Sequence, residues 1–572
     1  MFRKNDQHLQ MPLFSSINAL PEKLQKRLEV SWSGTFYHEF FVRIDEEPFT
    51  ILYSDEASRP NIPINVLVGL ETLKSGFGWS DEEMYDHFCY DVQVRYALGY
   101  RDLSEGHFEL RTVYNFRQRV TKHMQETGEN LIEVAFEQVT DEQIAAFELK
   151  TNKLRMDSTL VASNIREMSR LQLLVEVLQR VHRMLAKPDQ QRYAEAFAPY
   201  LKGSSGQYIY HLKGEESQAH LQRMGDLMQQ LLAELPDTYA TEPAYQVLAR
   251  VFKEHFISQQ GEVQVKAGQQ LSASSLQSPD DWEATYRQKR GQGHQGYVSN
   301  AAETCHPQNP FQLIVQMQTE PNTTDDAVML AEALPQLKER TDVEQMDTDG
   351  GYNSPAVDAV MRENEVVQIQ TAIRGRQPAA ERLALDDFDW QTDPDGHPQT
   401  VTCPHGQQAT VTPARTESRY RAVFEKPDCE HCPLLAQCPT QALQRKPEQV
   451  LRFSQADLDL ALRRQRSAEA RTRQQNLRPA VEATIRAIKH PFANGQVPVR
   501  GLPRVSMVMV GSAAMNNVRQ INRYLTKQGK AKNGSQSSPQ GPSTSIFLFF
   551  RTRFRTYLRF ASCFEPTLAF QF

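Results

Sequence analysis

Long apolar runs are absent from this sequence, and their absence excludes a protein built from membrane-spanning helices. No stretch approaches the roughly 20 consecutive apolar residues that a helix needs to cross a bilayer, although 40% of the 572 residues are hydrophobic. The first residues also lack the basic, apolar and small-residue pattern of a signal peptide. We therefore expect a cytoplasmic protein with several globular domains.

Cysteine is scarce and unevenly distributed. Four of the seven cysteines fall within 36 residues: Cys403, Cys429, Cys432 and Cys438. A reducing compartment disfavours disulfides, so the crowding indicates a metal site. Cys429 and Cys432 have the spacing of a zinc half-site, and we predict a structural Zn²⁺ held by the four thiolates, with His405 and His431 as alternative ligands. The competing interpretation is a loop with reduced thiols.

Acidic residues are depleted in one segment, although the whole chain has a formal net charge of -6. Residues 445–532 hold 18 Lys or Arg against 5 Asp or Glu. Such a surplus favours an anionic partner, most simply nucleic acid. The basic residues of the run "LRRQRSAEARTRQQNLR" are expected to contact a DNA backbone, the alternative being a solvated helical face.

Hydrophobic periodicity divides the chain into modules. "PINVLVGLETLKSGFG" and "SDEEMYDHFCYDVQVRYALGY" are helical, with Ser80 as an N-cap. After a strand-like "LRMDSTLVASNI" come a long helical block and then alternating strands and helices, which describe an α/β domain with a mixed sheet. The predicted boundaries are an irregular lead-in at 1–62 with a strand-like "TFYHEFFVRI", a helical domain at 63–150, a core at 151–376 and 451–525 interrupted by a helical insertion at 165–260, a cysteine-rich insertion at 377–450, and a linker and tail at 526–572.

Three carboxylates stand at suggestive places in this order. Asp157 lies at a strand end, Asp349 lies where another strand meets two glycines, and Glu482 lies on a late helix. Each has an ordinary alternative as a turn, cap or surface residue. Together they could hold two divalent cations for phosphoryl transfer, because Mg²⁺ prefers carboxylate oxygens. On the late helix Arg478, Arg486 and Lys489 share the sector of Glu482 and are expected to contact DNA phosphates.

These motifs resemble those of the DDE transposases of bacterial insertion sequences. The residues Arg478, Glu482 and Lys489 match the Arg, Glu and Lys signature of one branch, "LRMDSTLVASNIR" is similar to the first-Asp motif, and "TDGGYNS" is similar to the second. The resemblance runs from about residue 60 to about residue 525. One departure is Gln475, where the signature has Tyr. Asp347 is a second candidate beside Asp349, which we prefer because Gly-Gly follows it.

The resemblance implies a fold and a chemistry. The expected fold is an α/β ribonuclease-H-like catalytic core with a mixed sheet, an N-terminal helical domain, an inserted helical subdomain and a small cysteine-rich insertion. Asp157, Asp349 and Glu482 would be the catalytic residues and would bind two Mg²⁺ or Mn²⁺ ions. The expected partners are double-stranded DNA, as element ends and target, and further copies of the chain in a synaptic complex. The rivals are a nuclease without strand transfer and a catalytically silent DNA-binding repressor.

Overall fold

The computed structural model describes residues 2–10, 15–54, 60–210, 212, 214–371, 373, 381–416, 418–443, 448–472, 477 and 480–534. Residue contacts divide the chain into a unit at residues 1–522 and a second at residues 523–572. Most of the second unit, including the predicted tail from residue 535, lies outside the described residues. No helix among the described residues is long and apolar enough to cross a membrane.

The N-terminal part is helical from its beginning. Residues 1–62, for which we expected an irregular segment with a strand-like run, contain the helix α2 (Trp32–Glu39) instead. Ser31 caps it by accepting a hydrogen bond from the Ser33 amide, and a local cap of this kind favours a helix over a strand. The helices are α1 (Glu22–Glu29), α2, α3 (Ile64–Phe77), α4 (Asp81–Tyr90), α5 (Val92–Ala97), α6 (Leu110–Thr127) and α7 (Leu131–Ala146), with 3₁₀ turns at Gln7–Leu9, Phe41–Arg43 and Glu47–Leu52.

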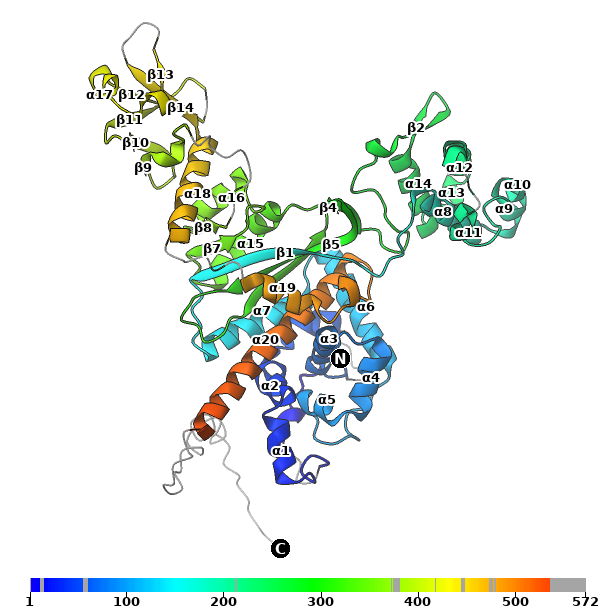
Figure 1. The fold of residues 1–572 in the computed structure, drawn as a ribbon. Helices are drawn as coiled ribbons and strands as arrows, with labels where there is room; N and C mark the ends of the chain where they lie inside the picture. The colour runs from blue at the N-terminus through cyan, green and yellow to red at the C-terminus, as the bar shows by residue number, and fades with distance from the viewer. Residues whose placement is uncertain are drawn as a thin grey trace, which may run out of the picture. The chain divides into compact units, whose positions relative to one another are not determined.

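A six-stranded mixed sheet forms the centre of the first unit (Figure 1). β1 pairs antiparallel with β5 and parallel with β7, β7 pairs parallel with β8, and β5 also pairs antiparallel with β4 and β6. This order is compatible with a ribonuclease-H-like core. The strands are β1 (Lys153–Val161), β4 (Thr285–Lys289), β5 (Gln292–Thr304), β6 (Ile314–Pro321), β7 (Gln345–Thr348) and β8 (Val367–Gln370), and the helices that follow β6 and β7 are α15 (Asp326–Arg340) and α16 (Pro355–Glu363).

The helical block between β1 and β4 has its own hydrophobic core, built around residues such as Leu174, Leu178 and Met228. It also contains a two-stranded hairpin, which the periodicity did not reveal. Its elements are α8 (Arg170–Met184), α9 (Lys187–Arg192), α10 (Ala194–Phe197), α11 (Ser205–Tyr210), α12 (Ser217–Glu234), α13 (Pro236–Tyr239), α14 (Pro243–His255), β2 (Phe256–Gln259) and β3 (Glu262–Val265), with 3₁₀ turns at Gly214–Glu216 and Gly268–Gln270.

The cysteine-rich region folds as a second, antiparallel sheet in the strand order β13-β14-β12-β11-β10-β9. Its apolar side chains, among them Phe388, Val401 and Phe453, form a separate core. The elements are β9 (Asp389–Thr392), β10 (Pro398–Thr402), β11 (Gln408–Pro413), β12 (Arg419–Phe424), α17 (Lys426–Glu430), β13 (Gln441–Ala442) and β14 (Gln449–Ser454), with 3₁₀ turns at Leu385–Asp387 and Leu435–Gln437.

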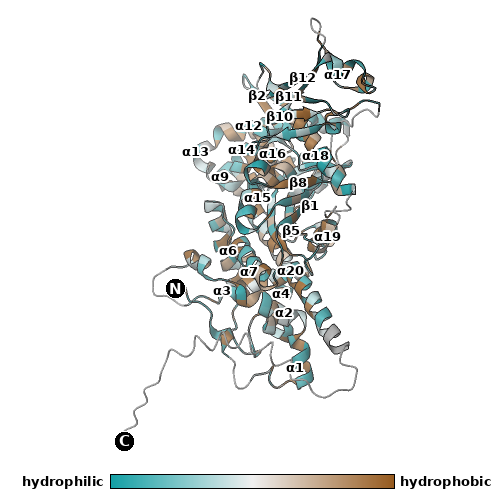
Figure 2. Cartoon of the chain, turned by 90° about the vertical axis from the view of Figure 1, so that its left-hand side faces the viewer, coloured by the Kyte–Doolittle hydropathy of each residue, from teal (hydrophilic) through white to brown (hydrophobic). Residues whose placement is uncertain are grey.

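Three helices close the chain: α18 (Gln455–Thr472), α19 (Val481–Lys489) and α20 (Leu502–Gly534), with a 3₁₀ turn at Ala493–Gly495 between the last two. α20 packs closely on α3, because a Cβ at Gly511 would meet the Ser75 side chain at 2.8 Å. Arg519 adds a hydrogen bond to the Gly76 carbonyl. Figure 2 shows apolar stretches on both of these helices.

The predicted N-cap at Ser80 is confirmed, and it is part of a capping box. The Ser80 hydroxyl accepts from the Glu83 amide, and the Glu83 carboxylate accepts from the Ser80 amide. Ser80→Ala should lower the free energy of unfolding by about 1 kcal/mol, because the Glu83 amide at the start of α4 loses its acceptor. Urea unfolding would measure the loss. Ser80→Asp, which retains an acceptor, should remain close to wild type, and an equal loss in both variants would contradict the capping role.

Candidate active site

Asp157 and Asp349 lie on neighbouring parallel strands. In the pairing of β1 with β7, Leu154 lies opposite Met346 and Arg155 lies opposite Asp347. Continuing this register by two residues brings Asp349, just after β7, level with Asp157. Side chains two residues apart share one face of a strand, so both carboxylates belong to the same face of the sheet. Asp157 lies in the middle of β1, and not at a strand end as we expected from the sequence.

A buried tyrosine lies near both carboxylates, whose charges raise its pKa. The Tyr352 side chain is fully buried, and its hydroxyl donates to Asn300 Oδ1 at 2.7 Å. Burial raises the pKa of Tyr352, and the nearby charges of Asp326, Asp157 and Asp349 raise it further. Three carboxylates from β1, the start of α15 and the end of β7 therefore lie in the neighbourhood of one phenol.

Local hydrogen bonds hold this end of the sheet in shape. The Gly351 amide donates to Asp349 Oδ1 at 2.6 Å, which closes a tight turn after β7. The Ser158 hydroxyl donates to Asp326 Oδ1 at 2.8 Å and ties β1 to α15. Sequence reasoning did not single out Asp326, because an acid at the start of a helix is common for reasons of helix stability.

The helix α19 lies against β1 (Figure 1). Val481, Thr484 and Ile488 are its buried residues, and Ile485 packs against the same core while partly buried. Near its first turns the Thr484 hydroxyl donates to Glu303 Oε1 at 2.8 Å. At its end Lys489 Nζ donates to the Leu160 carbonyl at 2.8 Å. Since Glu303 lies opposite Arg155, the helix runs in the same direction as β1 and passes beside Asp157.

The remaining signature residues have different environments. Glu482 and Arg486 are exposed on α19, whereas Lys489 is half-buried. Arg478 and Gln475 lie outside the described residues. Within the described ranges, no three Asp, Glu, His or Cys side chains are gathered closely enough to share one metal ion. In the structure Asp157 thus lies within β1, Asp349 lies just after β7, and Glu482 lies on the adjoining helix.

Asp347, the second candidate on β7, has a different environment from Asp349. It is fully buried, and Gln345 Nε2 donates to Asp347 Oδ2 at 2.6 Å. Burial raises the pKa of Asp347 to about 6. The neighbouring Arg155 does not neutralise it, because that guanidinium is engaged by Glu303, with Nη2 2.6 Å from the carboxylate. A residue of this kind is suited to a structural role.

The basic helix α18 is occupied mainly with internal contacts. Arg463 is buried and forms an ion pair with Asp358 on α16. Arg464 approaches Asp386 at 3.5 Å, and Arg471 donates to the Thr371 carbonyl at 2.7 Å. These three residues thus bind the core and the cysteine-rich region. Sequence alone could not show this, because their partners lie 78 to 105 residues away.

The four clustered cysteines lie beside the core of the second sheet, on α17 and in the connections between its strands. All four are reduced, and burial raises the pKa of Cys429, as do the neighbouring thiols of Cys438, Cys403 and Cys432. The Gln407 amide donates to Cys403 Sγ at 3.4 Å, and the Thr440 hydroxyl donates to Cys438 Sγ at 3.3 Å.

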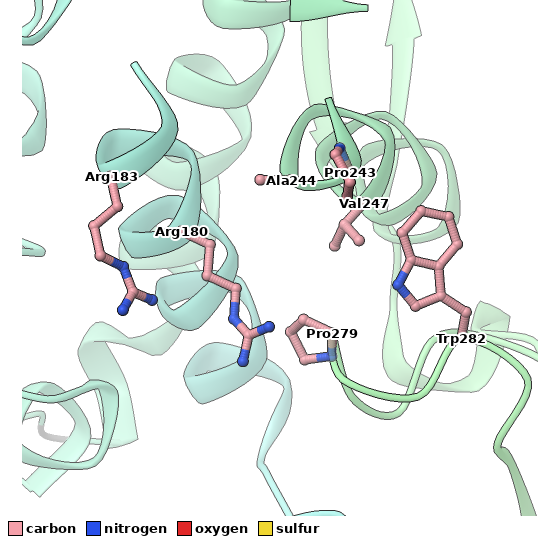
Figure 3. A pocket seen from close by; sticks show the side chains of 7 residues that line it. All are labelled: Arg180, Arg183, Pro243, Ala244, Val247, Pro279 and Trp282. Atoms are coloured by element: carbon pink, nitrogen blue, oxygen red, sulfur yellow. The ribbon is translucent and has the colours of Figure 1, made fainter. Parts of the chain in front are cut away.

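A cavity of about 250 Å³ lies in the helical insertion, away from the carboxylates (Figure 3). Arg180 lines it but is paired with Asp280 at 2.8 Å, whereas the Arg183 side chain is exposed. The other lining residues are Pro243, Ala244, Val247, Pro279 and Trp282.

The burial of Asp347 predicts how stability depends on pH. A carboxyl whose folded pKa is raised binds a proton more tightly in the folded state, so stability is lost as pH rises from about 4 through 6. The wild-type chain should therefore lose on the order of 3 kcal/mol of its free energy of unfolding between pH 4 and pH 6, and Asp347→Asn should not show this loss. Urea unfolding at pH 4 and at pH 8 would measure it. Asp342→Asn, an exposed neighbour, is the matched control, and an unchanged pH dependence in Asp347→Asn would contradict the assignment.

Comparison with protein families finds one match, to the family described as "Transposase DDE domain", over residues 402–522. No curated protein and no solved structure matches the chain. The matched segment contains Glu482, the rest of α19 and the four cysteines, and it ends within α20; it does not contain Asp157 or Asp349. Together with the mixed α/β architecture, the match supports a DDE transposase.

Proposed function

We propose that the chain is the transposase of an insertion sequence, which binds the element's ends, hydrolyses a phosphodiester bond there and joins the freed 3′-hydroxyl to target DNA. The observation that carries the proposal is the parallel register of β1 with β7. Extended by two residues, this register sets Asp349 level with Asp157, although the two are 192 residues apart in sequence.

The side chains present fit a divalent metal of the magnesium type. Asp157 and Asp349 offer hard oxygen donors, and Glu482 on the adjoining helix would complete the set. Two Mg²⁺ or Mn²⁺ ions bound there would activate the attacking oxygen and stabilise the leaving oxygen. The Asp326 carboxylate accepts a hydrogen bond from Ser158 on β1 and adds negative charge near the proposed metal ligands.

The chain's own cationic groups would position the DNA. Arg486 is exposed on α19, one helical turn after Glu482, and is proposed to contact a phosphate of the strand being cut, as is Arg478. Lys489 is held by Thr159 and Leu160 in the second half of β1, which fixes its ammonium group beside that strand. A cation fixed there would help to align the scissile phosphate. Because the two ends of an element must be brought together, the active form would contain more than one copy of the chain.

The choice between the two aspartates of β7 tests this assignment directly. Asp349→Asn should lower the rate of strand cleavage at least a hundredfold, because a metal ligand contributes several kcal/mol to the transition state. Asp347→Asn should retain cleavage and strand transfer, because that carboxyl is enclosed in the protein. The measurement is denaturing electrophoresis of labelled element ends incubated with Mg²⁺.

The same gel separates the rival functions. Nicks with longer joined products support a transposase, whereas nicks without joined products would indicate a nuclease. Binding of DNA in Ca²⁺ without cleavage in Mg²⁺ by the wild-type chain would indicate a silent DNA-binding protein. Equal cleavage by wild type and Asp349→Asn would contradict the proposed site.

We also propose that the cysteine cluster binds a structural Zn²⁺. The support is that three reduced thiols lie in the neighbourhood of the Cys429 thiol and that an amide and a hydroxyl donate to two of the sulfurs, since such donors commonly stabilise metal-bound thiolates. The thiols would have to converge further on the ion. Tetrahedral coordination by four thiolates is a frequent structural site for zinc.

Elemental analysis of the purified full chain tests the zinc proposal. About one zinc per chain is expected, and Cys429→Ser should lose most of it. Cys89→Ser, which changes a cysteine outside the cluster, should retain the metal. A wild-type chain without zinc after expression in zinc-supplemented medium would overturn the proposal.

A further inference from the structure

The hairpin formed by β4 and the first half of β5 carries charge of one sign. Residues 284–302 contain no Asp or Glu, whereas Arg287, Lys289 and Arg290 lie on β4 or at the tip. Arg290 and Gly291 both have positive φ, at 53° and 79°, which gives the tight turn that suits a two-residue hairpin loop. The turn leaves Lys289 and Arg290 exposed.

The base of this hairpin is fixed to the core. Thr285 Oγ1 donates to Asn322 Oδ1 at 2.8 Å, and Asn322 Nδ2 donates to the His294 carbonyl at 3.0 Å. The Arg287 guanidinium donates to the Asn322 and Thr324 carbonyls at 3.3 and 3.5 Å. Because the base of the hairpin is held by these hydrogen bonds, the position of the charged residues Lys289 and Arg290 at its tip is restricted.

The hairpin starts where α19 ends. Leu160 and Val161, the last residues of β1, lie opposite Val298 and Tyr297 of β5. At Gly296 the strand bends with φ of 133°, and a Cβ there would clash with the Val161 carbonyl oxygen. The Leu160 carbonyl accepts from Lys489.

The positive charge at the tip of the hairpin affects the pKa of Lys489. Burial lowers the pKa of Lys489, and the positive charge of Lys289 lowers it further. The ammonium groups of the hairpin and of α19 are therefore close enough to repel each other. Among the described residues, neither Lys289 nor Arg290 has a carboxylate partner within salt-bridge distance. Repulsion between like charges is relieved when an anion binds between them.

We propose that the tip of the β4–β5 hairpin, Lys289 and Arg290, binds the phosphate backbone of the DNA duplex whose strand is contacted by Lys489. The hairpin and α19 then form two sides of one DNA-binding surface at the end of β1. The inference rests on the proposed function, because it assigns an additional contact to the same DNA. Backbone contacts of this kind position DNA and carry no sequence information.

The salt dependence of DNA binding tests the inference. The full-length double variant Lys289→Ala/Arg290→Ala should bind duplex DNA in Ca²⁺ about tenfold more weakly at low salt. Its plot of log affinity against log salt should be shallower by about 1.8, because each lost phosphate contact removes about 0.9 from the slope. Titrations with a labelled duplex of the element's end at several salt concentrations would measure both quantities.

Two control variants make the test specific. Lys202→Ala/Arg223→Ala removes the same charge from exposed positions in the helical insertion and should leave the slope unchanged. Lys289→Arg/Arg290→Lys keeps the charge at the tip and should retain wild-type binding. A hairpin double variant with the wild-type slope, in a chain that still cleaves element ends, would overturn this inference alone. A reduced slope in a chain that never cleaves would leave the DNA contact standing and contradict the proposed function.

Discussion

A buried ion pair between Arg155 and Glu303 holds the candidate site together. Arg155 lies on β1 two residues before Asp157, and Glu303 lies opposite it on β5, with Arg155 Nε and Glu303 Oε2 2.7 Å apart. The pair also binds the closing helix, because Glu303 accepts from Thr484 and Arg155 donates to the Leu477 carbonyl at 3.0 Å. Two strands and the helix that carries Glu482 therefore meet at one point.

The Arg155–Glu303 pair contributes more to the placement of α19 than to the free energy of unfolding. Burial raises the pKa of Glu303 even though Arg155 and Thr484 lower it, so the cost of removing the carboxylate from water is only partly recovered. An apolar pair of similar size would pack as well but would leave the angle of α19 unspecified. Two guanidinium nitrogens on Glu303 Oε2, together with the hydrogen bonds to Thr484 and Leu477, fix that angle. Precision at this point matters because α19 reaches the core only after the separate cysteine-rich sheet.

Much of the central architecture could be predicted from the sequence, because its elements have strong local signals. The runs that became β5, β6, α15 and α16 alternate or repeat with clear periods, and the capping box at Ser80 is a local motif. Asp157 and Asp349 could be selected from the motifs around them, but only Asp349 stands where a strand ends, because Asp157 lies in the middle of β1. Their adjacency depends on a parallel register that no local pattern encodes. The partners of Arg463 and Arg464, the second sheet, and the proximity of Asp326 and Lys289 to the site all arise from long-range packing.

The parallel pairing of β1 with β7 also sets an order of events during synthesis. Leu154 leaves the ribosome 192 residues before its partner Met346, which is an interval of roughly 10 to 40 s at ordinary elongation rates. For that time one edge of β1 has no partner, and an open strand edge invites pairing with other chains. The intervening helical insertion has its own hydrophobic core and can condense as a unit before β7 appears. Once the insertion has folded, the flexible chain between β1 and β7 is shorter, so less conformational entropy is lost when the two strands pair. The insertion therefore assists the pairing of the two strands that carry the site.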